Sequence, residues 1–495
     1  MTTNLNFKIL ASLMIGILLL ASNCVKNPVT GKRDFVLMSE KQEIALGKQS
    51  DPGVVASFGL YENVTMQKFI QTKGKKMAAV SHRPNLDYQF KILDSPVVNA
   101  FAVPGGYVYF TRGIMAHFNN EAQFAGVLGH EIGHVTARHS VKQQSKQMLG
   151  QLGLMVGIIA SKDFRRFANE ASQALGLLFL KFSRNNETEA DRLGVEYSTK
   201  IGYNAKEMAG FFETLGRLSG GPENRIPTFQ STHPDPADRY NKTKKLAREW
   251  QAKTPGSKYN VNRNSYLRMI DGLVYGEDPR QGFVENNNFY HPELKFWFPV
   301  PQGWLTQNSP QAFQMAPKDG KAMMMLALAQ GKTLNAAVKE TLDQFGLTKI
   351  SQKNKTVNGL PAMELIADKV PTAEEQQQAQ QQGQKAKTLS TISYFIQYNG
   401  MIYKIIGLTY KETFGTYKSR FLNTMTRFDK LTDQDKLGRQ PERIKIVTLT
   451  KSSTLKDALR YYKIPSKRLE EFAILNGMKL TDPVSKGMLI KVVKK

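Results

Sequence analysis

Cysteine is almost absent from this chain, whose 495 residues include only Cys24. An intrachain disulfide is therefore excluded. Acidic side chains are also few: 42 Asp and Glu stand against 68 Lys and Arg, for a formal net charge of +26. The lysines are scattered and no nucleic-acid-binding motif occurs, so we expect no nucleic-acid partner. An anionic envelope surface explains the charge better, and a generally basic proteome is the alternative.

Apolar runs long enough to cross a membrane comfortably are missing as well. The run at residues 9–21, after Lys8, has the layout of a secretory signal peptide. It ends near Cys24, whose position resembles the acceptor cysteine of bacterial lipoproteins, although Asn23 replaces the usual small residue. We therefore expect lipidation at Cys24, with an ordinary signal peptide as the alternative. The run at residues 148–160 contains three glycines and is expected to form a buried or cleft-lining helix, with a membrane-touching hairpin as the alternative.

The sequence does contain a metal-binding motif, HExxH, in which His130 and His134 flank Glu131. Residues four apart lie on one face of a helix, so the two imidazoles can bind one metal ion. A helix is predicted independently, because Asn120 occupies an N-cap position and Gln123 follows at the capping-box spacing. A five-residue motif with only three fixed positions can also arise by chance. The neighbouring residues argue against that alternative.

Two glycines and two carboxylates support the motif. Gly129 and Gly133 each destabilise a helix and lie on one face, so we expect another segment to approach that face closely. A catalytic zinc ion needs a third protein ligand, and we assign Glu187, with Asp191 four residues later orienting a histidine. Glu189 is the competing ligand, but it points about 200° away from Glu187 on a helix. A solvated acidic helix face is the other alternative.

These motifs together resemble a known family. HEIGH, followed some fifty residues later by SRNNETEAD, is similar to the zinc metallopeptidases related to the CAAX prenyl protease, a gluzincin group that includes HtpX and BepA. Further matches are NPVTGK at 27–32, NAFAVPGG at 99–106 and STHP at 231–234, and the resemblance covers roughly residues 27–290. It implies a mainly helical metallopeptidase domain with a small edge sheet and one Zn²⁺ ion.

The resemblance also implies roles for single residues. Glu131 would take a proton from a zinc-bound water and return it to the leaving amine. The family places a histidine and an arginine near the metal at the spacing of His233 and Arg239. Arg239 would stabilise the oxyanion. His233 would assist it or occupy the fourth zinc position as a reversible latch, and a plain His-Pro turn is the alternative.

A β-hairpin is predicted before the zinc motif. Two β-rich runs, 97–103 and 107–110, are separated by Pro-Gly-Gly. The resemblance places the first run beside the cleft, where its edge would bind an extended peptide by β-augmentation. The residues expected to bind substrate are Asn99, Ala100, Phe101 and Ala102. A purely structural hairpin is the alternative.

The end of the chain predicts a strand, two helices and a strand. This order resembles LysM, the peptidoglycan-binding module, but Lys451-Ser452-Ser453 replaces the usual Gly-Asp before the first helix. A purely structural cap is the alternative. Upstream, residues 291–430 read as an antiparallel α+β domain, and the Gln-rich tract at 374–384 is expected to be a loop.

We therefore expect an α+β protein built from several segments. They are a signal peptide at 1–23, a zinc metallopeptidase domain at 24–270, a connecting segment at 271–290, an accessory domain at 291–430, a linker at 431–441 and the LysM-like module at 442–495. We expect surface or core-polar roles for the four histidines that have no such motif partners: His82, His117, His139 and His291.

The expected function is a zinc metalloendopeptidase that hydrolyses unfolded or misassembled envelope polypeptides. We expect it in the periplasm of a bacterium, anchored by lipid to the outer membrane, with peptidoglycan contact through the last module. One alternative is a chaperone or assembly factor whose zinc site is latched. The other is a peptidoglycan-associated binding protein.

Overall fold

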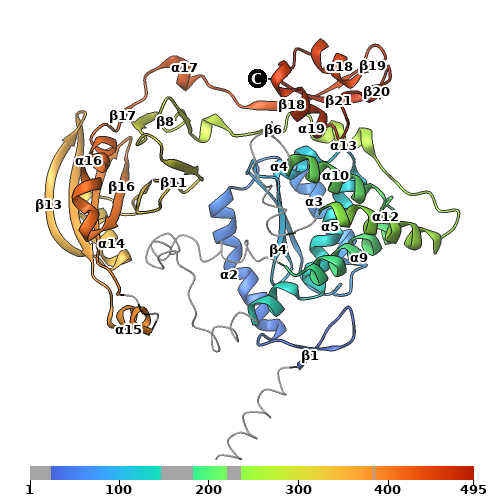
Figure 1. Ribbon diagram of the computed structural model, residues 1–495, viewed down its shortest axis with the longest axis horizontal. Helices are drawn as coiled ribbons and strands as arrows, with labels where there is room; N and C mark the ends of the chain where they lie inside the picture. Colours follow the sequence, from blue (N-terminus) through green and yellow to red (C-terminus); the bar gives the residue numbers. More distant parts are fainter. Residues whose placement is uncertain are drawn as a thin grey trace, which may run out of the picture.

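A computed structural model describes residues 24–145, 182–219, 233, 236–381, 383 and 385–494. The expected signal peptide and the apolar run at 148–160 lie outside the described residues. Within those residues, no helix is both long and apolar enough to cross a membrane. Figure 1 shows a mainly helical lobe and a sheet-rich lobe, with the end of the chain returning to the helical lobe.

The helical lobe contains short sheets and a set of packed helices. Its helices are α2 (Glu40–Phe58), α3 (Val64–Ala78), α4 (Arg112–His117), α5 (Glu121–Thr136), α9 (Arg184–Lys200), α10 (Glu207–Ser219), α12 (Pro236–Ala252) and α13 (Arg263–Met269). Its strands are β1 (Cys24–Lys26), β2 (Arg33–Phe35), β3 (Gln89–Leu93), β4 (Ala100–Val103) and β5 (Tyr107–Thr111). Helix α5 is buried along its whole length, so the zinc motif lies in the centre of this lobe.

A three-stranded sheet lies beside α5, in the order β3-β5-β4. Strands β4 and β5 are antiparallel, which confirms the predicted hairpin, and β3 joins β5 in parallel. Among the described strands, β4 pairs only with β5, so one backbone edge of β4 has no strand beside it.

The sheet-rich lobe is an antiparallel α+β unit, as predicted. Its main sheet has the order β10-β11-β12-β16-β15-β14-β13. These strands are β10 (Leu305–Asn308), β11 (Ala312–Ala316), β12 (Ala322–Leu328), β13 (Thr348–Val357), β14 (Leu360–Lys369), β15 (Leu389–Tyr398) and β16 (Met401–Tyr410). Helices α14 (Leu334–Phe345) and α16 (Phe414–Met425) belong to two separate apolar cores of this lobe. Both faces of β15 are therefore buried.

Smaller elements complete this lobe. A four-stranded sheet contains β7 (Phe283–Glu285), β8 (Asn288–His291), β9 (Phe296–Pro299) and β17 (Asp429–Lys430). The short helices are α15 (Ala373–Gln381) and α17 (Gln434–Leu437), with 3-10 turns at Pro279–Gln281 and Lys411–Thr413, whereas a third 3-10 turn, Ser466–Arg468, belongs to the end of the chain. The loop predicted for the Gln-rich tract is wrong over α15, because Glu, Gln and Ala are good helix formers despite their low complexity.

The end of the chain has the predicted strand-helix-helix-strand order. It comprises β18 (Glu442–Thr448), β19 (Ser453–Thr454), α18 (Leu455–Tyr461), α19 (Leu469–Leu475), β20 (Pro483–Val484) and β21 (Leu489–Lys494). Strand β18 pairs with β21 and with β6 (Val274–Tyr275) of the connecting segment.

This terminal unit shares an apolar core with the helical lobe. Phe472 and Ile490 belong to the same buried cluster as Phe124 and Leu128 of α5. The buried ammonium group of Lys491 donates hydrogen bonds to the carbonyl oxygens of Ala116, Phe118 and Leu475, at 2.7 to 2.8 Å. The last strand therefore supports the segment that leads into α5.

Candidate metal centre

Helix α5 begins where the sequence predicts. The side chain of Asn120 caps it by accepting a hydrogen bond from the Gln123 backbone at 2.8 Å. The reciprocal bond of a capping box is shifted by one residue, because Gln123 Oε1 accepts from the backbone nitrogen of Asn119 at 2.7 Å. The cap satisfies orphan backbone donors and fixes the start of the helix.

Helices α5 and α9 approach each other closely at their glycines. A Cβ atom added at Gly129 would lie 2.9 Å from the carbonyl oxygen of Gly194, and one added at Gly133 would lie 3.0 Å from Leu193 Cβ. This contact confirms the predicted approach of another segment. Helix α9 is capped by Ser183, and its first turn carries Glu187 toward the histidines of α5.

Four side chains converge between these helices. The Nε2 atoms of His130 and His134 are 3.0 Å apart, and the carboxylate of Glu187 lies 3.5 to 3.6 Å from them. His233 contributes Nδ1, which lies 3.3 Å from His130 Nε2 and 2.9 Å from Glu187 Oε1. One ligand atom from each of the four residues lies within 4.8 Å of the others, and all four are buried.

This donor set fits a zinc ion. Tetrahedral coordination with Zn–N bonds near 2.0 Å places two ligand nitrogens about 3.3 Å apart, close to the observed separations of the imidazoles. Glu187 Oε2 accepts no hydrogen bond from the described residues, although Arg239 lies 3.3 Å away. Burial of such a group is costly unless a cation compensates it. The cluster therefore fits one zinc ion, with His130, His134 and Glu187 as the predicted ligands and His233 beside them.

Asp191 and Arg239 support His130. The Nδ1 atom of His130 lies 2.9 Å from Asp191 Oδ1, and the guanidinium of Arg239 donates to both Asp191 oxygens at 2.6 and 2.8 Å. Burial alone would raise the pKa of Asp191, but Arg239 and the hydrogen bonds outweigh it and lower the pKa to about 2. The carboxylate stays ionised and orients the imidazole, which is the role predicted for Asp191.

Glu131 lies beside the cluster without joining it. Its side chain is buried, and Oε1 accepts no hydrogen bond from the described part of the chain, with His233 Nε2 at 3.8 Å. Burial raises the pKa of Glu131 to about 7, with Glu187 adding to the effect and His233 and Arg239 opposing it. A carboxyl group with this pKa can accept and release a proton near neutral pH.

His139, for which the sequence predicts a surface or core-polar role, is buried and contacts two side chains that the sequence did not predict as its partners. Its ring is buried, with Nδ1 2.9 Å from Nδ1 of His134 and Nε2 3.1 Å from Glu189 Oε2. Helical spacing could not predict the contact, because α5 ends at Thr136 and Arg138 has a left-handed backbone, with φ of 56°. Glu189 is not among the clustered residues, as its angle on α9 predicted.

The other site predictions fall on the hairpin and near the start of the chain. Ala100, Phe101 and Ala102 lie in β4, and Asn99 immediately precedes it. Strand β4 contacts α5, the helix that carries the zinc motif. Cys24 begins β1. Substrate binding at β4 and lipidation of Cys24 stay predictions.

This region is similar to known metallopeptidases. Residues 65–247 match the model of Peptidase family M48. The chain is 31% identical over 171 residues to the mitochondrial metalloendopeptidase OMA1 of Arabidopsis thaliana, covering 34% of this chain and 33% of that protein. It is 28% identical to the beta-barrel assembly-enhancing protease of Escherichia coli K12, covering 41% and 43%, and 32% identical to the metalloprotease YcaL of the same strain, covering 30% and 58%.

The matches thus span about half or less of the length of most of these relatives, and they centre on the zinc cluster. Helix α5, helix α9 and all four clustered ligands lie within residues 65–247. The part of the chain that contains the candidate zinc cluster is therefore similar to the metalloendopeptidases of family M48.

Proposed function

We propose that the whole protein is an endopeptidase that cleaves unfolded or misassembled polypeptides of the bacterial cell envelope. The observation that carries the proposal is the buried Glu131 carboxyl beside the His130, His134 and Glu187 cluster. The similarity to the beta-barrel assembly-enhancing protease of E. coli supports an envelope substrate. Export and lipid anchoring at Cys24 are part of the same proposal.

The residues have distinct roles in peptide hydrolysis. When bound, the zinc ion polarises a water molecule and the substrate carbonyl. Glu131 takes the proton from the attacking water and delivers it to the leaving nitrogen, a transfer that its pKa of about 7 favours. Arg239 contacts Asp191 and Glu187, and its positive charge beside the cluster would stabilise the oxyanion.

The substrate would lie along β4. The edge of β4 that has no described strand beside it could add an extended peptide as a further strand, through main-chain hydrogen bonds that require little sequence preference. Asn99 to Ala102 would supply these bonds. An unfolded polypeptide meets this requirement and a folded domain does not, which supports the proposed substrate class.

His233 supports a second candidate function, a chaperone or assembly factor with a latched site. Its Nδ1 atom lies 2.9 Å from Glu187 Oε1 and 3.3 Å from His130 Nε2, where it would compete with a substrate or water for a bound metal ion. Cleavage then requires His233 to leave. His233→Ala should raise peptidase activity if the histidine is a latch and lower it if the histidine assists catalysis.

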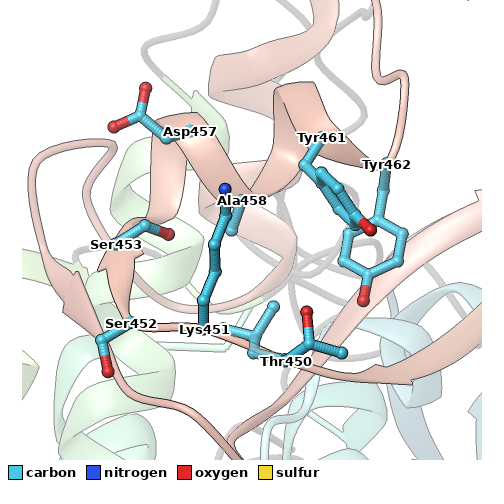
Figure 2. Close-up of a pocket in the computed structure, with 9 residues that line it drawn as sticks. Thr450, Lys451, Ser452, Ser453, Asp457, Ala458, Tyr461 and Tyr462 are labelled. Carbon is cyan, nitrogen blue, oxygen red and sulfur yellow. The ribbon is translucent and has the colours of Figure 1, made fainter.

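Glycan binding is a third candidate, favoured by a pocket of about 320 Å³ in the terminal unit. Figure 2 shows Tyr461 and Tyr462 on one side of Lys451, and Asp457 on the other. The Tyr461 side chain is 62% exposed, and its ring stands perpendicular to that of Tyr462. Exposed aromatic rings with nearby polar groups suit a saccharide. Cosedimentation with peptidoglycan should fall for Tyr461→Ala, and equal sedimentation of both proteins would contradict glycan binding here.

Zinc content and casein cleavage test the main proposal. We expect about one zinc per chain and cleavage of unfolded casein by the wild type. Glu131→Gln should keep the zinc and lose cleavage, because the amide cannot accept the proton. Zinc in both proteins with cleavage in neither would favour the latched chaperone, and full activity of Glu131→Gln would contradict the assigned role of Glu131.

A further inference from the structure

We propose that His139 and Glu189 form a hydrogen-bonded relay that orients His134 and fixes its tautomer as a zinc ligand. The relay consists of two contacts in series, His134 Nδ1 to His139 Nδ1 and His139 Nε2 to Glu189 Oε2. Both residues lie outside the ligand set. The inference rests on the proposed zinc site, and it assigns two positioning residues that neither the HExxH motif nor the third ligand reveals.

The positions of the ring nitrogens determine which nitrogen of each imidazole carries a hydrogen. Nε2 of His134 faces the cluster, 3.0 Å from Nε2 of His130, so it must be unprotonated to bind zinc. The hydrogen of His134 is then on Nδ1, which donates it to Nδ1 of His139 at 2.9 Å. His139 consequently carries its own hydrogen on Nε2 and donates it to Glu189 at 3.1 Å. If His139 were protonated on both nitrogens, its Nδ1–H would face the Nδ1–H of His134. The hydrogen bond between the two rings would then be lost.

The surroundings leave little freedom for another arrangement. The side chain of His139 is fully buried, whereas that of Glu189 is 23% exposed. The ring of Phe182 stacks on His134 with centroids 4.2 Å apart, which restrains the tilt of the imidazole. Arg138 sets the turn before His139, and its guanidinium is held by Glu43 at 2.8 Å and by the Met38 carbonyl oxygen at 2.9 Å.

The two zinc histidines are thereby supported in different ways. His130 meets the carboxylate of Asp191 directly, whereas His134 reaches the carboxylate of Glu189 through a second imidazole. A carboxylate partner makes an imidazole a more basic ligand. The relay transmits part of that effect across a neutral ring, so breaking either contact should weaken zinc binding while leaving all the ligands in place.

Zinc affinity is the direct test, measured by competition with a chromophoric chelator on the full mature chain. His139→Phe removes both contacts and should weaken binding about 10- to 100-fold. His139→Asn keeps an acceptor near the Nδ1 position and should recover part of that loss. Glu189→Gln keeps an acceptor but removes the charge, and should weaken binding by a smaller factor. Glu213→Gln, on the exposed side of α10, is the matched control and should bind as the wild type does.

Cobalt substitution separates positioning from general damage to the fold. The visible absorption of bound Co²⁺ should shift in Glu189→Gln, while the Tm of the metal-free protein stays that of the wild type, because Glu189 is partly exposed. Zinc affinities within twofold of wild type for both His139→Phe and Glu189→Gln would overturn the relay and leave the zinc site intact. A wild type that binds no zinc would overturn the site and the relay together.

Discussion

Gly129→Ala tests how tightly the packing of α5 on α9 positions the zinc ligands. The added Cβ would lie 2.9 Å from the Gly194 carbonyl oxygen and 3.0 Å from Gly194 Cα. Ordinary contacts begin at 3.4 Å, so the helices must separate by about 0.5 Å, the difference between 3.4 and 2.9. Overpacking of this kind costs about 1–3 kcal/mol. The better helix propensity of alanine offsets about 1 kcal/mol of that cost.

We therefore expect a net loss of about 1 kcal/mol in the free energy of unfolding, which for a domain of this size lowers the Tm by about 3 °C. Zinc affinity should fall too, because α5 carries His130 and His134 while α9 carries Glu187. Thermal unfolding of the zinc-loaded protein and chelator competition measure the two effects.

Gly216→Ala is the matched control for Gly129→Ala. Gly216 lies within α10, and no atom of the described residues would come within 4 Å of its added Cβ. The alanine should raise stability by up to about 1 kcal/mol through helix propensity alone. If Gly129→Ala raised the Tm as Gly216→Ala does and left zinc affinity unchanged, the close packing of α5 and α9 would not determine the geometry of the site.

Three further predictions concern metal, pH and the terminal strand. Chelation should lower the Tm reversibly, because zinc at about 1,000 times its Kd contributes about 4 kcal/mol, and an unchanged Tm would contradict the site. Burial lowers the pKa of His117 in the folded protein to about 4. Below pH 6.5 the unfolded chain therefore binds more protons at this histidine than the folded chain does. The free energy of unfolding should consequently fall by about 3 kcal/mol from pH 6.5 to 4. In His117→Asn this loss should shrink, as urea unfolding at several pH values would show. Lys491→Met leaves three carbonyl oxygens without their donor and should lower the free energy of unfolding by at least about 2 kcal/mol, measured in urea at pH 7.

The local parts of the fold could be predicted from the sequence because short-range chemistry encodes them. The Asn120 cap, the four-residue spacing of His130 and His134 and the glycines of α5 all act within a few turns of one helix. Glu187 could be found because Asp191 follows it at helical spacing. The hairpin of β4 and β5 follows from its Pro-Gly-Gly turn.

Other contacts could not be predicted because no local pattern encodes them. His139 reaches His134 only because Arg138 turns the chain after α5 ends. Lys491 contacts carbonyl groups that precede it by 375 and 373 residues, and its sequence context is that of an ordinary strand. Hydrophobic periodicity predicts which face of an element is buried, but it does not say which distant element covers that face.

These long-range contacts change how experiments on the terminal unit should be read. Lys491 supports the segment before α5, and Phe472 and Ile490 share a core with that helix. Deleting residues 442–495 would expose this core and remove the support, so peptidase activity would fall whether or not the unit binds glycan. A substitution confined to the exposed pocket, such as Tyr461→Ala, leaves those contacts in place. Loss of peptidoglycan binding with unchanged cleavage in that variant would separate the two roles of the terminal unit.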